Sequence, residues 1–195
     1  MGDRYTACII TDKDTGGGHY IYSHWSGWRG DAVMVTAAAR FLKLDPEQQV
    51  PGALVNLVAH GFGYNDDGSC IAEITSVDED VDEARARGDH DFPRRATDGV
   101  AIDLSHAGGS ATVNGESYSS LESFVREAGP RVMQDQLDGL AYGVDYEREA
   151  QGLAKTHAKH YLILRSATIH ELSDALEDLG IEPIAPRVTS AGISI

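Results

Sequence analysis

The chain of 195 residues is poor in cysteine, in basic residues and in long hydrophobic runs. Its two cysteines, Cys8 and Cys70, each stand beside apolar neighbours, which is typical of buried reduced thiols and predicts no structural disulfide. No apolar stretch approaches the roughly 20 residues that a membrane-spanning helix needs. These features predict a cytoplasmic protein that does not bind a membrane.

Basic residues are outnumbered by acidic ones, with 16 lysines and arginines against 31 aspartates and glutamates and a net charge of −15. Such a surface repels the phosphates of duplex nucleic acid, so direct binding to a duplex is not expected. An acidic excess is most often a solubility feature. The alternative is an acidic face that mimics a nucleic acid and occupies a basic groove on another protein.

Motifs that would define a reaction are also missing. The sequence has no Gly-x-Ser-x-Gly, no Cys-x-x-Cys and no His-Glu-x-x-His motif. His157 and His160 are three residues apart and share a helix face, but this spacing alone matches no specific metal motif. We therefore expect no cofactor, no metal and no enzymatic activity. A metal-dependent hydrolase that uses His24, His60 and nearby aspartates is the alternative.

Short runs rich in β-branched and aromatic residues, bounded by turn residues, predict the strands. The predicted strands cover residues 5–11, 19–25, 70–77, 100–104, 110–113 and 161–164. A triple glycine joins the first pair, and Gly108 and Gly109 join the pair that starts at residue 100, which predicts two hairpins.

Apolar residues at helical spacing, together with capping signals, predict the helices. Helical patterns cover residues 32–42 and 51–60. A third helix is predicted to begin at a capping box of Ser119 and Glu122. A last helix is predicted to run from a capping box of Thr168 and Glu171 to Gly180. We expect Asp31 to be the N-cap of the first helix and Gly61 to end the second. Residues 130–159 favour a helix interrupted by three glycines.

Hairpin signals outnumber strand–helix–strand units. The sequence therefore predicts a single α+β domain over residues 1–195, with a mostly antiparallel sheet built from hairpins and covered by helices. Residues 78–91 carry seven acidic residues against Arg85 and Arg87, and we expect them to form an exposed segment. Asp80, Asp82 and Glu83 are its candidate contacts with a partner.

The segment of residues 19–31 is the best candidate for a site, because it contains both tryptophans with two tyrosines and two histidines. Aromatic faces stack on bases, sugars or cations. The residues predicted to bind a ligand or partner are Tyr22, His24, Trp25, Trp28 and Arg29. The alternative is that the two tryptophans cover one end of the core.

The stretch Tyr20-Ile21-Tyr22-Ser23-His24-Trp25-Ser26-Gly27-Trp28, which follows a first strand, resembles a motif of small phage and prophage proteins. Those proteins, whose function is unassigned, carry Tyr-x-His-Trp-Asp-Gly-Tyr and then a helix that begins near a glycine. The resemblance covers about the first 45 residues, and this chain departs from it at Ser26 and Trp28. It implies a viral or mobile-element origin and an accessory role inside a bacterial or archaeal host.

Taken together, the residues and the resemblance predict a non-enzymatic, phage-type accessory protein that binds a host component. An inhibitor of host defence or of another host protein would fit this description. The alternatives are a small-ligand or nucleotide-binding protein that uses the aromatic segment, and the metal-dependent hydrolase.

Overall fold

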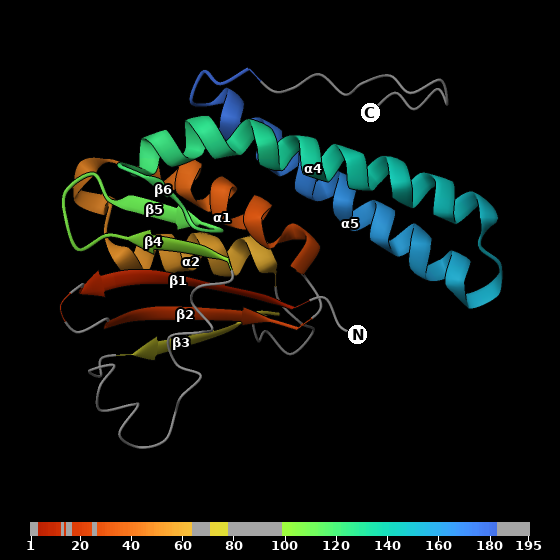
Figure 1. The fold of residues 1–195 in the computed structure, drawn as a ribbon, viewed down its shortest axis with the longest axis horizontal. Coiled ribbons are helices and arrows are strands. Elements are labelled where there is room, and N and C mark those ends of the chain that lie inside the picture. The colour runs from red at the N-terminus through yellow and green to blue at the C-terminus, as the bar shows by residue number, and fades with distance from the viewer. Residues whose placement is uncertain are drawn as a thin grey trace.

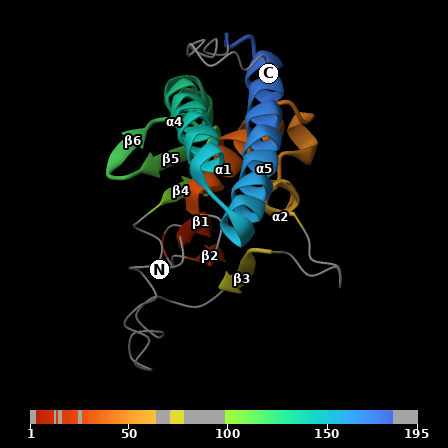
Figure 2. The same ribbon diagram turned by 90° about the vertical axis from the view of Figure 1, so that its right-hand side faces the viewer.

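The computed structural model describes residues 4–12, 14, 17–24, 27–63, 71–77 and 99–182. Within these ranges, six strands form one sheet, and the four α-helices lie together on one side of it (Figures 1 and 2). The α+β class with a mostly antiparallel, helix-covered sheet is confirmed. The acidic segment of residues 78–91 lies outside the described residues.

The strand order across the sheet is β3-β2-β1-β4-β5-β6. The strands are β1 (Tyr5–Asp12), β2 (Gly17–Ser23), β3 (Glu73–Val77), β4 (Val100–Asp103), β5 (Ser110–Val113) and β6 (Glu116–Tyr118). Both predicted hairpins are present, and β1 and β4 form the one parallel pair among these strands. Gly18 is needed in β2, since a Cβ there would lie 2.2 Å from the Ile9 carbonyl oxygen.

Cys8 lies in β1 as a buried free thiol, as its apolar neighbours predict. Burial raises the pKa of this thiol to about 12, with a further contribution from the charge of Asp103. A thiol with such a pKa stays protonated near neutral pH and is a poor nucleophile. Cys70 lies outside the described residues.

Helix α1 (Gly27–Leu42) is the centre of the core and packs against α2, α4, α5 and β1. Every residue from Ala32 to Ala39 is buried, which explains the apolar pattern on all sides of this helix. The prediction that Asp31 caps α1 is wrong, because the helix begins four residues earlier at Gly27. Its first turn is held by contacts with other helices, which apolar periodicity alone does not reveal.

A 3-10 turn (Pro46–Gln48) leads into α2 (Pro51–Phe62), which buries Leu54, Val58 and Phe62 at intervals of four residues. The sequence predicts a start at Pro51 or Gly52, and the helix begins at Pro51. The predicted end at Gly61 is wrong by two residues: the helix continues to Phe62, and Gly63, with a φ of 82°, follows it. A glycine is suited to that position because it adopts positive φ without strain.

Helix α4 (Leu121–Glu149) is continuous through Pro130, Gly139 and Gly143, so two of the three interruptions predicted at glycines are absent. The third is present, because α4 ends at Glu149 and the next helix begins at Gly152. Gly139 and Gly143 permit close packing of the neighbouring helix, since a Cβ on either would collide with side chains of that helix. The capping box consists of Ser120 and Ser123, one residue beyond the predicted pair of Ser119 and Glu122.

Helix α5 (Gly152–Glu177) runs antiparallel beside α4 and corrects two predictions. Residues 161–164, predicted as a strand, lie inside this helix, because a four-residue apolar run does not distinguish a buried strand from a helix face. The predicted capping box at Thr168 and Glu171 is also wrong, since the Thr168 hydroxyl donates to the Leu164 carbonyl within the helix. No helix in the described part of the chain is long and apolar enough to cross a membrane.

Candidate functional site

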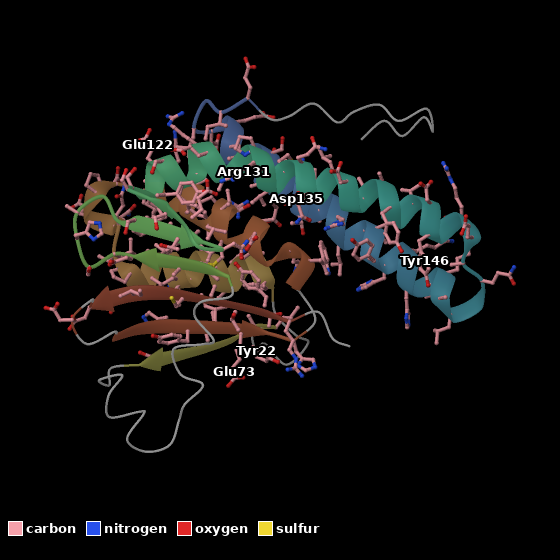
Figure 3. The ribbon with its side chains drawn as sticks, in the orientation of Figure 1. Tyr22, Glu73, Glu122, Arg131, Asp135 and Tyr146 are labelled. Carbon is pink, nitrogen blue, oxygen red and sulfur yellow. The ribbon has the colours of Figure 1, made fainter. Side chains whose placement is uncertain are left out.

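Tyr22 and His24 lie together at the end of β2. Their side chains are hydrogen-bonded, with 2.9 Å between the Tyr22 hydroxyl oxygen and His24 Nδ1, and Tyr22 pairs across the sheet with Glu73 of β3 (Figure 3). Ile21 and Ser23, which alternate with them, are buried on the helix-covered face. Buried and partly exposed side chains therefore alternate along this strand, as expected where one face of a sheet is covered.

Trp28, in the first turn of α1, packs into a cluster that joins three helices. The guanidinium carbon of Arg165 lies 4.9 Å from the centroid of the Trp28 ring and 5.2 Å from that of Tyr161. Gln136 of α4 donates to the Trp28 carbonyl at 2.8 Å and accepts from Arg165 Nε at 3.2 Å. Gly139 makes room for this guanidinium, because a Cβ there would lie 1.2 Å from Arg165 Nη1. These contacts give Trp28 a packing role.

Arg29, the next residue, turns toward α2 instead. Its Nη2 donates to the Phe62 carbonyl oxygen at 2.5 Å, and its guanidinium carbon lies 5.8 Å from the centroid of the Phe62 ring. The C-terminal end of a helix carries partial negative charge, which favours a cation there. Arg29 also lines a groove between α1, α2 and α5.

The predicted site residues are therefore distributed over three places. Tyr22 and His24 meet at the end of β2, Trp28 packs against α4 and α5, and Arg29 faces α2. Trp25 lies outside the described residues, as do Asp80, Asp82 and Glu83 of the acidic segment. Their role in partner binding stays a prediction.

A polar corner that sequence reasoning missed lies where β1 begins and α1 starts. Among the described residues, the hydroxyls of Tyr5 and Ser23 are the two buried side-chain groups without a hydrogen-bond partner, and these residues pair across β1 and β2. The Asp31 carboxyl is close enough to the Tyr5 hydroxyl to affect its ionisation. Burial, followed by the negative charge of Asp31, raises the pKa of Tyr5 well above its usual range, so this hydroxyl remains a proton donor.

The pKa of the Asp31 carboxyl also depends on the groups at this corner. Burial raises the pKa of this carboxyl, the nearby Tyr5 hydroxyl opposes that rise, and the negative charge of Asp135 on α4 adds to it. The sequence signal was present, since an aspartate stands among the apolar residues of α1. Apolar periodicity predicts an N-cap at this position, because it does not reveal the turn of helix that precedes Asp31.

This carboxyl predicts a specific pH dependence of stability. Because the pKa of Asp31 is higher in the folded chain than in the unfolded one, its contribution is favourable below the unfolded pKa of about 3.9 and is lost as the pH rises through the folded pKa. We therefore expect Asp31→Asn to raise the melting temperature at pH 7 and to have a much smaller effect near pH 3.

Thermal unfolding followed by circular dichroism at both pH values measures this difference. Asp138→Asn, at an exposed position of α4, is the control and should leave the melting temperature nearly unchanged at both. An Asp31→Asn variant that is less stable than the wild type at pH 7 would show that the carboxylate is favourable in the folded state.

Residues 103–106 bring an aspartate, a serine and a histidine together, but not as a catalytic triad. The Ser105 hydroxyl donates to Asp103 Oδ1 at 2.6 Å, and His106 Nδ1 lies 3.8 Å from the same oxygen. The serine is therefore bonded to the carboxylate rather than to the imidazole that would act as its base. No group of three or more potential metal ligands occurs within the described ranges.

The most exposed apolar side chains of the helices lie on the α4–α5 hairpin. It extends past the edge of the sheet in Figure 1, and Figure 3 shows Tyr146 on the projecting part. Tyr142 and Tyr146 of α4 are 71% and 48% exposed, and Leu153 and Ile163 of α5 are 71% and 68% exposed. We call these four residues the hairpin surface.

No family model matches this chain, and comparisons with curated proteins and with solved structures found no significant similarity.

Proposed function

We propose that the chain is a phage-type accessory protein, not an enzyme, that binds a host protein through the hairpin surface. The observation that carries this proposal is the exposure of four large apolar side chains on a helical hairpin that projects from the domain. Large apolar side chains that one structural element exposes to solvent are typical of protein contact sites. Tyrosine is among the residues that contribute most to binding energy at interfaces.

The charges of the two helices support an oriented contact with a partner. Residues 152–170 of α5 contain no acidic residue but have two lysines and three histidines, besides the buried Arg165. Residues 135–149 of α4 contain five acidic residues and one arginine. A partner with the opposite arrangement of charges would associate faster and in a single orientation.

The test is a comparison of proteins captured from a bacterial or archaeal host lysate. We expect the wild-type chain to retain a specific host protein, and the double variant Tyr142→Ala with Leu153→Ala to bind the purified partner at least about 30-fold more weakly, as for the loss of one interface hot spot. Both side chains are exposed, so the melting temperature should change little.

Val50→Ala provides a matched control, because Val50 is also an exposed apolar residue, 52% exposed, but lies before α2 rather than on the hairpin. It should leave partner binding unchanged. Equal retention of the partner by the hairpin variant and the control would exclude the hairpin surface as the contact.

A further inference from the structure

We propose that the groove between α1, α2 and α5, here called the helix groove, binds a small organic anion. It encloses about 200 Å³. One face of α1 forms its length, because Arg29, Val33, Thr36 and Arg40 are spaced four, three and four residues apart and so share a side of the helix. On the α1 side, an arginine therefore stands at each end of the helix groove, with the smaller Val33 and Thr36 between them.

The middle of the helix groove is apolar. Val33 of α1, Leu57 of α2, and Leu164 and Ala167 of α5 all line it. Small-molecule sites are usually lined by apolar side chains with a few polar groups that orient the ligand. The apolar lining favours an organic ligand over a bare inorganic ion, because the body of the ligand can leave water there.

The charge of the helix groove differs from that of the chain. Among the described residues that line it, Arg29 and Arg40 are positive and Glu171 is negative, which gives a net charge of +1 with His60 neutral. The whole chain has a net charge of −15. A positively charged groove in such a chain selects for an anionic group, such as a carboxylate or a phosphate.

The two arginines are held differently. The bond from Arg29 to the Phe62 carbonyl restrains its guanidinium, which lowers the entropic cost of placing this cation in the groove. Arg40 Nη1 lies 3.7 Å from Glu171 Oε2, and the two side chains are 34% and 46% exposed. An ion pair this long and this exposed contributes little to stability, so Arg40 can turn toward a ligand at small cost.

Isothermal titration calorimetry on the purified full chain with hexanoate, hexyl phosphate and hexanol tests this assignment. We expect one or both anions to bind and hexanol, which has the same apolar body, to bind at least about tenfold more weakly, as for loss of a charge-assisted hydrogen bond. The anion that binds more tightly distinguishes a carboxylate from a phosphate ligand.

Two variants locate the binding. Ala167→Phe places a ring in the helix groove from an exposed position of α5 without changing any charge, and it should abolish binding while the fold is retained. Arg40→Gln should weaken binding about tenfold, and Arg148→Gln, which removes an exposed arginine far along α4, should leave it unchanged.

Three results would overturn the assignment: no heat of binding from either anion, hexanol binding as tightly as the anions, or anion binding that survives both Ala167→Phe and Arg40→Gln. If one of these two variants does not fold, judged by circular dichroism, the other alone decides. Because the hairpin surface and the helix groove share no residue, the outcome is independent of partner binding.

Discussion

Replacement of Arg165 by alanine is expected to lower the free energy of unfolding by about 2–5 kcal/mol, the usual cost of truncating a large buried side chain. Arg165 is only 6% exposed, stacks on the rings of Trp28 and Tyr161, and donates to Gln136. The substitution leaves a void between three helices and removes the donor to a buried amide oxygen. Urea unfolding followed by far-UV circular dichroism measures the loss.

Arg148→Ala is the matched control for this prediction. Arg148 also belongs to the α4–α5 hairpin, but it is 52% exposed at its side chain and lies 3.4 Å from an exposed Asp145. We expect its replacement to change the free energy of unfolding by no more than about 0.5 kcal/mol. Similar losses in the two variants would mean that the cluster around Arg165 contributes no more than a surface ion pair.

Gly30→Ala should cost about 1–3 kcal/mol of unfolding free energy through overpacking, although alanine is intrinsically the better helix former. A Cβ on Gly30 would lie 2.3 Å from the Tyr5 ring. The ring cannot easily move away, because Tyr5 is buried and the Phe62 ring centroid lies 6.2 Å from its own. Urea unfolding of Gly30→Ala and of the wild type measures this difference in unfolding free energy.

A double-mutant cycle tests the stated cause. In a Tyr5→Leu background the loss caused by Gly30→Ala should shrink or reverse, because the ring that blocks the added methyl group is absent. Gly52→Ala is the control, since nothing lies within 4 Å of a Cβ at this position of α2, and it should stabilise the chain by about 0.5–1 kcal/mol. An equal loss at Gly30 with and without the Tyr5 ring would disprove the collision.

Local signals in the sequence were sufficient for much of the fold. Two hairpins and the α+β class follow from the strand patterns and turn glycines, which act over a few residues. The start of α2 follows from the proline at residue 51 in the same way. The strand predicted at residues 161–164 failed because four apolar residues fit a strand and a helix face equally well.

The candidate site was predicted less well than the fold. Composition alone singled out residues 19–31, and the polar corner of Tyr5, Ser23 and Asp31 does adjoin this segment. The hairpin surface and the helix groove were not predicted, because each combines helices that are distant or misassigned in the sequence.

By itself, the sequence determined which segments pair as hairpins and that the charge is strongly acidic. Only the tertiary structure decided where Trp28 and Arg29 point. Once α1 begins at Gly27, these neighbours project about 100° apart around the helix, one toward Arg165 of α5 and the other toward Phe62 of α2. Periodicity is a local property, whereas the start of that helix depends on contacts with residues more than 100 positions away in the chain.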